Sequence, residues 1–463
     1  MPTHLSRLQN DRTQHLSLAE AMAHGRELRA GVPREAHREF SAMAADATSG
    51  TAPERDPLGI LDTQDATRLP ELVPLRRERM LASPFAFYRG TAGIMAADLA
   101  RGVDTGISVV ACGDAHISNF GLFASPQRSL VFDLNDFDES APAPWEWDLK
   151  RLVASVVIGA RDAGADEKAV RRAALASAAA YRVGLRDMMK LDALERYYSR
   201  IDTDRARTDL DSSAQKVLDR ATRQARKRTS RAYVEKITTR ADDGTLLIVE
   251  DPPVLTHLAT SIESEIEELF EQYRSTVPAD IALLLSQFTL TDVARRVVGV
   301  GSVGTRCFIL ILEGPSGEPL VLQVKEAQTS VLQSFGAASS PFRYESEGHR
   351  VVASQRTLQA VSDSFLGHLQ FGGHDFYVRQ FRDMKGSIDP STLREKDFRS
   401  YVVACGTVLA RAHAQSLDAP VIAGYLGTSR AVDRAVVEWS IDYADVSLSD
   451  YEAYRDASRS VSA

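Results

Sequence analysis

The chain has 463 residues, of which 44% are hydrophobic and 25% are charged, as is ordinary for a soluble globular protein with a sizeable core. Its 55 basic and 63 acidic residues give a net charge of −8, which argues against a generally basic nucleic-acid-binding protein. Three widely spaced cysteines match neither a zinc site nor a disulfide framework and suit a reducing cytoplasm. The polar N-terminus and the lack of any apolar window near about 18 residues predict neither export nor membrane spanning.

The first part of the chain has a mixed polar composition that predicts an arm or cap over residues 1–70, with a helix near 16–28. Residues 72–101 are basic and then apolar, which predicts two helices broken near Ser83 and Pro84. The arginines of this stretch could meet an anionic ligand, although a solvated helix surface is the simpler interpretation for at least two of them. They are Arg76, Arg77, Arg79 and Arg89.

Residues 112–140 read CGDAHISNFGLFASPQRSLVFDLNDFDES and contain two clusters of acidic and amide side chains. Each cluster follows a short apolar run, 107–111 or 130–132, that is typical of a buried strand. Hard divalent cations such as Mg²⁺ bind carboxylate, amide and phosphate oxygens, so the stretch predicts a phosphate and metal site. An acidic surface turn is the alternative. The clusters are Asp114, His116 and Asn119, then Asp133, Asn135, Asp136, Asp138 and Glu139.

The middle of the chain predicts mostly helices, over residues 145–163, 166–189 and 261–273. Residues 216–231 are basic at helical intervals but lack interleaved aromatic residues, which favours a solvated helix face over a phosphate or nucleic-acid contact. A hairpin is expected between residues 233–239 and 245–250.

Residues 292–328 show three β-like runs, with a G-x-G-x-x-G motif between the first two. A dinucleotide-binding fold would need a helix after this loop, but residues 306–312 have the β-branched and aromatic composition of a strand. A glycine loop between antiparallel strands, followed by a strand with an interior lysine, is how protein kinases hold ATP phosphates. Lys325 is that lysine, and a lysine on a solvated edge strand is the alternative interpretation.

A helix over residues 344–360 offers Glu345, Glu347 and Gln355 as partners for Lys325, although each could equally be a solvated surface group. A strand pair, 365–371 and 375–382, a helix over 396–414 and a helical tail over 419–463 complete the chain. The candidate nucleotide-binding residues are Gly299, Gly301, Ser302, Gly304, Lys325, Glu347 and Arg379.

The run GDAHISN resembles the catalytic loop of aminoglycoside and choline kinases, G-D-x-H-x-x-N, and NDFD resembles their metal-binding I-D-F/W-x segment. This resemblance implies a catalytic group of Asp114, His116 and Asn119, in which Asp114 orients or deprotonates the acceptor hydroxyl. It also implies that Asn119 and Asp136 hold Mg²⁺ with help from Asp138. Because the catalytic loop precedes the glycine loop, the chain would be circularly permuted, which surface termini permit.

Across SPFAFYRGTA, CGDAHISNFG, FDLNDFDE, WEWDLKRL, YVRQFRDMKGS and LARAHAQS, the sequence also resembles a bacterial family known as domain of unknown function 2252. That resemblance implies membership of the family and brings no assigned activity.

Together these patterns predict an α+β protein with a two-lobe, kinase-like fold in permuted order. We expect a cap over residues 1–70, a helical catalytic and metal-binding lobe over 71–290, a β-rich nucleotide lobe over 291–393, and C-terminal helices over 394–463 that pack on the catalytic lobe. The expected activity is cytoplasmic, ATP- and Mg²⁺-dependent phosphotransfer to a small-molecule or protein hydroxyl. The alternatives are AMP transfer, an ATP-sensing pseudokinase and a metal-dependent hydrolase, and the acceptor and oligomeric state stay open.

Overall fold

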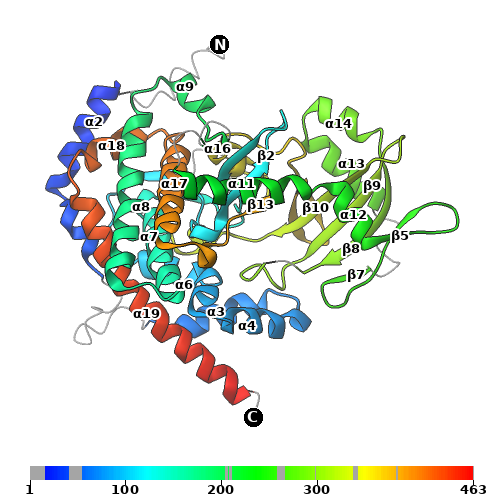
Figure 1. Ribbon diagram of the computed structural model, residues 1–463, viewed down its shortest axis with the longest axis horizontal. Helices are drawn as coiled ribbons and strands as arrows, with labels where there is room; N and C mark the ends of the chain where they lie inside the picture. Colours follow the sequence, from blue (N-terminus) through cyan, green and yellow to red (C-terminus); the bar gives the residue numbers. More distant parts are fainter. Residues whose placement is uncertain are drawn as a thin grey trace, which may run out of the picture.

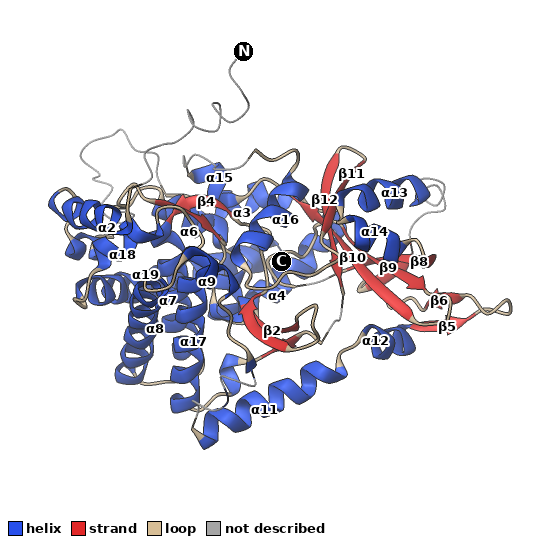
Figure 2. Ribbon diagram, turned by 90° about the horizontal axis from the view of Figure 1, so that it is seen from above, coloured by secondary structure: helices blue, strands red, loops and turns tan. Residues whose placement is uncertain are grey.

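The computed structural model describes residues 16–40, 55–203, 207, 211–257, 266–297, 299–336, 343–381 and 384–461. Helices and sheets are both abundant, so the α+β prediction is confirmed. In Figure 1 the long helices gather at one side of the molecule and the largest sheet lies at the other, and Figure 2 shows the same division from above. No helix in these described ranges has the length and apolar character needed to cross a membrane.

The helical side is built on α7 (Trp145–Asp162), α8 (Glu167–Met188) and α17 (Glu395–His413), close to their predicted bounds. Small side chains let α8 and α17 approach closely, since Gly406 packs against the Ser177 carbonyl and leaves no room for a Cβ atom. Helices α18 (Ala419–Leu426) and α19 (Ala431–Val461) pack on the same core. The segment before residue 70 joins it too, through α2 (Leu18–Glu27), which lies along α18.

Six antiparallel strands form the main sheet, in the order β11-β12-β10-β9-β8-β7. The strands are β7 (Leu255–His257), β8 (Thr289–Arg296), β9 (Cys307–Glu313), β10 (Pro319–Ala327), β11 (Gly367–Phe371) and β12 (His374–Gln380). The predicted glycine hairpin is therefore β8 and β9, and the lysine strand is β10, which pairs with β9 and β12.

Alternation along β10 and β12 decides which side chains face the helical side. Leu322, Val324, Phe376 and Val378 belong to one apolar cluster, which includes Tyr273 of α13 (Ile266–Thr276). Successive side chains of a strand point to opposite faces, so the intervening polar residues share the other face. These are Gln323, Lys325, Tyr377 and Arg379, which stand opposite one another in register as Lys325 with Tyr377 and Gln323 with Arg379.

Two small sheets carry the acidic loops. Strand β1 (Ser108–Ala111) pairs with β4 (Ala141–Pro144), and β2 (Phe120–Ala124) pairs with both β3 (Leu130–Leu134) and β13 (Gly386–Ser387). The first acidic loop follows β1 and the second follows β3, as the apolar runs predict. Because β13 comes shortly after β12, the chain passes directly from the main sheet to the sheet beneath the loops.

Two predicted segments differ in the structure. Residues 72–101 form three helices, α4 (Val73–Leu81), α5 (Pro84–Arg89) and α6 (Ala92–Leu99), because the chain breaks again at Gly90. Residues 233–237 belong to helix α12 (Ser230–Ile237), which Thr229 caps by accepting a hydrogen bond from the Ala232 amide, so the expected hairpin is shorter. Residues 261–265 of the helix expected over 261–273 lie outside the described ranges.

The remaining elements are short or peripheral. They are the 3₁₀ helices η1 (Leu28–Ala30), η2 (Arg34–Arg38), η3 (Pro70–Leu72), η4 (Ile117–Asn119) and η6 (Pro390–Thr392), the helices α3 (Pro57–Ala66), α9 (Ala193–Tyr198), α11 (Ser212–Lys227), α14 (Ala279–Leu285), α15 (Val331–Phe335) and α16 (Glu347–Leu358), and the hairpin strands β5 (Thr238–Arg240) and β6 (Leu246–Ile248).

Candidate active site

The first acidic loop is fixed by a buried carboxylate of α7. The amides of Cys112 and Gly113 donate to the two oxygens of Asp148, at 2.6 and 2.9 Å. Asp148 also lies 3.1 Å from Nε2 of His413, at the end of α17. Gly113 has φ +80° and packs against the backbone of Glu139, so a side chain there would meet both strain and a clash. The backbone leading into Asp114 is therefore held from two sides.

Asp114 faces the pocket and is paired with Arg151 of α7, whose Nη2 lies 2.8 Å from Oδ1. Burial raises the pKa of Asp114 above its ordinary value, and the Arg151 charge opposes this shift only in part. His116 lies 3.5 Å away, between Nε2 and Oδ2 of Asp114, and burial holds its pKa well below the usual range. Asp114 is thus a half-buried carboxylate with a raised pKa, beside an imidazole whose pKa is lowered.

Asn119 completes the first loop. Its Nδ2 donates to the backbone carbonyl of Asp114 at 2.8 Å, which uses the donor end of the amide. The acceptor end, Oδ1, is left as the group that could bind a cation. Both Asn119 and Asp114 line the same pocket.

The second acidic loop contains two aspartates with different surroundings. Asp133 is 2% exposed and accepts hydrogen bonds from the amides of Leu134 and Ala360, at 2.9 and 2.8 Å, so it anchors the loop. Asp136 lines the pocket, and its Oδ1 is buried without a hydrogen-bond partner among the described residues. Burial raises the pKa of Asp136, but nearby cations, Lys325 foremost, lower it more, so its pKa lies below the ordinary value. Asp136 is the better metal ligand.

Lys325 meets this loop directly. Its Nζ lies 3.9 Å from Oδ1 of Asp136 and pairs with Oδ2 of Asp138. The Tyr377 hydroxyl donates to the other oxygen of Asp138 at 2.6 Å. Asp138 therefore has both oxygens engaged and holds the lysine, whereas the sequence suggested a metal ligand. The carboxylate partner of Lys325 comes from the acidic loop.

None of the three expected partners, which lie on α16 or, for Glu345, just before it, pairs with Lys325. Glu347 pairs with Arg350 instead, and Gln355 donates to Gln359 at 2.9 Å. Glu345 lies beside His349, whose Nδ1 accepts a hydrogen bond from the Glu345 amide at 3.2 Å. The reason is geometric, because the Lys325 side chain points from β10 toward the acidic loop.

Arg350 is a site residue that the sequence did not indicate. It is fully buried, and its guanidinium donates to the carbonyls of Asp138 and Gln328, at 3.0 and 2.8 Å, and to that of Ser140. A Glu-x-x-Arg pair on a helix normally suggests solvent-exposed charges, so its sequence carried no clear signal. Arg350 ties α16 to both the acidic loop and the end of β10.

The glycine loop is held by the N-terminal helices. Arg79 donates to the carbonyl of Gly299 at 2.6 Å, and the amide of Leu69 donates to that of Gly304 at 2.8 Å. Gly299 and Gly304 have φ values of +74° and +91°, a backbone conformation that favours glycine. In Figure 1 α3 and α4 lie beneath this hairpin. Of these contacts, that of Leu69 comes from the segment predicted as a cap, and that of Arg79 comes from the segment predicted as the catalytic lobe.

One pocket joins the two acidic loops to the glycine loop, although they are far apart in sequence. The predicted residues that line it are Asp114, His116, Asn119, Asp136, Asp138, Gly299, Gly301 and Ser302. Lys325 lies behind the two aspartates. Arg379 does not line this pocket but a neighbouring one, and its Nε donates to Gln323 at 2.9 Å and its Nη1 to the Asn135 carbonyl at 3.4 Å. Gly304 flanks the pocket, and Glu347 is not among its lining residues.

The side chains fit a hard divalent cation. Asp136 offers a buried carboxylate oxygen that lacks a hydrogen bond in the described structure, and Asn119 offers an amide oxygen whose donor end is already used. An acidic surface turn would not place such an oxygen against a buried lysine.

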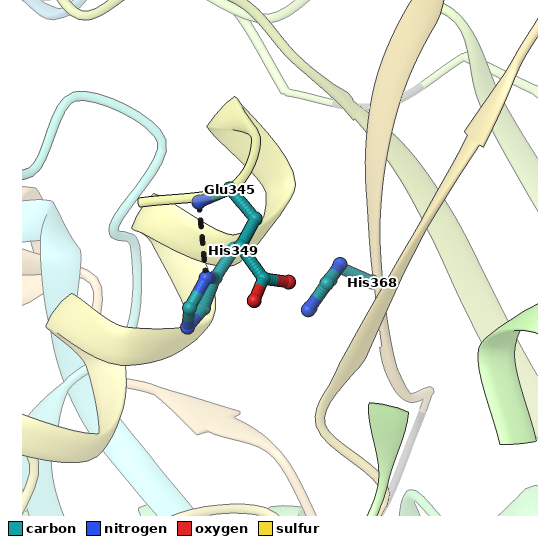
Figure 3. Close-up of side chains that lie close together, drawn as sticks. All are labelled: Glu345, His349 and His368. Carbon is teal, nitrogen blue, oxygen red and sulfur yellow. Dashed lines mark hydrogen bonds between the residues drawn. The ribbon is translucent and has the colours of Figure 1, made fainter. Parts of the chain in front are cut away.

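A separate cluster of possible metal ligands lies on α16 and β11. Glu345, His349 and His368 place one donor atom each within 4.8 Å of one another, as Figure 3 shows. The two imidazoles lie 5.0 Å apart between centroids and are nearly parallel, at 15°. None of the three lines the pocket, so this cluster has no part in the chemistry considered below.

Comparison with known proteins gives one match. A family model described as "Uncharacterized protein conserved in bacteria (DUF2252)" matches residues 68–457, which include both acidic loops and the glycine loop. No curated protein and no solved structure matches significantly.

Proposed function

The chain belongs to the DUF2252 family, whose description assigns no activity, and from the geometry of the pocket we propose an ATP- and Mg²⁺-dependent phosphotransferase of permuted, kinase-like fold. The main sheet would form the nucleotide lobe, and the acidic loops on the helical side would carry the metal and the catalytic carboxylate.

The proposal assigns a different task to each wall of the pocket. The backbone of the glycine loop and Lys325 would bind the phosphates, as in the glycine-loop and lysine arrangement of kinases. Bound by Asn119 and Asp136, Mg²⁺ would neutralise charge that develops on the transferred group. Asp114 would accept the proton of the acceptor hydroxyl, a task that suits its raised pKa, while Arg151 keeps its carboxylate in place.

The observation that carries the proposal is the meeting of Lys325 with Asp136, at 3.9 Å between Nζ and Oδ1. The permuted arrangement requires these two residues to lie within the span of a nucleotide triphosphate. Two unrelated motifs would have no reason to meet, and a glycine loop with only a turn function would not share a pocket with both acidic loops.

Nucleotide binding is tested first, by thermal shift with ATP and Mg²⁺. We expect ATP with Mg²⁺ to raise the melting temperature of the wild type, and this rise to be lost in Lys325→Ala and Asp136→Ala. Lys190→Ala is the matched control, since Lys190 is 73% exposed and remote from the pocket, and it should respond like the wild type. A wild type that ATP does not stabilise would contradict the proposal.

Turnover is tested with α- and γ-labelled ATP and candidate acceptors. Transfer of the γ label supports phosphotransfer, transfer of the α label indicates AMP transfer, and binding without transfer indicates a nucleotide sensor. Hydrolysis without ATP would point to a metal-dependent hydrolase. Asp114→Asn should keep nucleotide binding and lower the transfer rate by roughly 10²- to 10⁴-fold, as expected for loss of a general base.

A further inference from the structure

A half-buried arginine lies in the pocket without an ion-pair or hydrogen-bond partner for its guanidinium among the described residues. Arg89 ends α5 and lines the pocket together with Asp114 and Asp136. Within the described part of the chain its guanidinium forms no ion pair, and its Nε is buried without a hydrogen bond. Burial lowers the pKa of Arg89 despite the nearby carboxylates, which means that its charge is incompletely compensated.

Arg68 stands beside the glycine loop in a similar state. Its Nη1 donates to the carbonyl of Val303 at 2.6 Å, but its Nε is also buried and unpaired in the described structure. Burial lowers the pKa of Arg68 to about 10, so it remains charged at neutral pH. Gly301 approaches the Arg89 backbone, since a Cβ atom there would lie 3.2 Å from the Arg89 carbonyl. The two arginines therefore flank the loop that faces the phosphates.

Two other arginines of this segment have carboxylates beside them that compensate their positive charge. Arg76, which is fully buried, pairs with Asp65 at 2.6 Å and also donates to Gln64 and to the Gly90 carbonyl. Arg77 lies 3.6 Å from Asp65, between Nε and Oδ2. Arg76 and Arg77 also have an Nε without a hydrogen bond among the described residues, but each has a carboxylate beside it. Arg89 and Arg68 have no carboxylate within ion-pair distance in the described structure, so a bound anion would supply the missing charge.

We infer that Arg89, assisted by Arg68, binds the terminal phosphate of the bound nucleotide. The inference rests on the proposed function, and it adds a phosphate subsite on the N-terminal helices that the kinase-like motifs do not include. A phosphate dianion suits the planar, multidentate guanidinium. The subsite adjoins Asp114, the proposed base, so the phosphate it holds is the one that an acceptor hydroxyl would attack.

The test compares affinities for ATP, ADP and AMP, each with Mg²⁺, in the full-length wild type and in Arg89→Gln and Arg68→Gln. We expect Arg89→Gln to weaken ATP binding by roughly 10- to 100-fold while ADP binding changes little, as loss of a charged hydrogen bond predicts. Arg68→Gln should show a smaller change of the same kind. Arg77→Gln removes the same charge from the same segment outside the pocket and should leave the ratio of ATP to ADP affinity unchanged.

The melting temperature without ligand separates binding from a structural role. Because the Arg89 guanidinium has no partner in the part of the chain that the structure describes, Arg89→Gln should melt at the wild-type temperature or above, whereas loss of a structural arginine would lower the melting temperature. An unchanged ratio of ATP to ADP affinity would overturn the inference while leaving the proposed function intact. Equal losses of affinity for ATP and for ADP in Arg89→Gln would overturn it as well. The same holds if Arg89→Gln weakens only the binding of inorganic phosphate added together with ATP, because Arg89 would then bind a phosphorylated acceptor.

A thermal-shift measurement with magnesium pyrophosphate distinguishes failure of the phosphate subsite from failure of the proposed nucleotide binding. Magnesium pyrophosphate should stabilise the wild type, and Arg89→Gln should lose this effect. If that holds while no nucleotide binds, the phosphate subsite stands and the nucleotide assignment fails.

Discussion

The two acidic loops lie side by side in one pocket but are held in opposite ways. The first takes its main contacts from α7, where Asp148 and Arg151 lie 35 to 37 residues further along the chain. The second takes its contacts from Lys325, Arg350 and Tyr377, which lie 187, 210 and 239 residues from the groups they bind.

This difference shows which part of the site is autonomous. The side-chain contacts of the first loop with Asp148 and Arg151 come from a helix of its own side, and its backbone also packs against Glu139 of the second loop. The contacts of the second loop form only when β10, β12 and α16 pack against it. The conformation of this loop therefore depends on how the main sheet packs against the helical side. Substitutions that remove one set of contacts should therefore have effects that the other set does not share.

The largest effect is expected for Arg350→Ala, which leaves three carbonyls beside the second loop without their donor. Removing one partner of a buried charged network typically costs about 3–5 kcal/mol, and urea unfolding should show a loss of this size. Arg356→Ala is the control on the same helix, because Arg356 is exposed and, among the described residues, donates only to the Leu366 carbonyl, at 2.8 Å. Its cost should stay below about 1 kcal/mol. Equal losses of stability in Arg350→Ala and Arg356→Ala would contradict the conclusion that Arg350 holds the second loop.

A smaller effect is expected for Asp148→Asn in the first loop. The variant keeps one acceptor and loses the other, so about 1–3 kcal/mol of stability should be lost. Hydrogen exchange should increase at the amides of residues 112 and 113, while the Lys325 side of the pocket stays protected. Asp166→Asn, which replaces a helix cap by another good cap, should cost almost nothing. If exchange rose equally in both loops, the first loop would not be autonomous.

An effect that appears only on acidification is expected at His37, away from both loops. Its Nε2 lies 2.8 Å from the Tyr425 hydroxyl, which itself donates to Val32, and its Nδ1 is buried without a partner in the described structure. Burial lowers the pKa of His37 to about 3, so the folded state resists protonation. This stability is present above pH 6.5 and is lost as pH falls toward 3, by about 1.4 kcal/mol per pH unit. His37→Gln should flatten the dependence of the melting temperature on pH.

The smallest effect is expected for Glu347→Gln. Glu347 supports Arg350 from a partly exposed position, so its loss should cost about 1 kcal/mol or less. ATP affinity should not change, in contrast to Lys325→Ala. A matching fall in ATP affinity would restore Glu347 as a nucleotide-site residue.

The sequence predicted the local parts of the fold well. Helices α7, α8 and α17 and the β8–β9 hairpin each carry a pattern within a single segment, either an apolar periodicity or a pair of strands around glycines. The errors came where a local signal was overridden, as at residues 233–237, where the β-branched composition gave way to a capped helix. The division between cap and catalytic lobe remains a prediction.

The site was predictable only where its residues share a motif. Asp114, Asn119 and Asp136 stand in short runs, and Lys325 follows a glycine loop. Arg350 and Tyr377 act across distances of about two hundred residues, for which one sequence carries no signal. Asp148 and Arg151 did have a signal in the sequence, because they are charged residues in a helix in which almost every residue is buried. A helix without a polar face must find internal partners for its charges.

The separation between the second loop and its partners also has a consequence for synthesis of the chain. A ribosome releases residues 133–140 long before residues 325, 350 and 377, so the loop first exists without its lysine, arginine and tyrosine. Contacts of such sequence separation form slowly, because much of the chain must be ordered before they close. The first loop and α7 can form during elongation, and the second loop should become structured last.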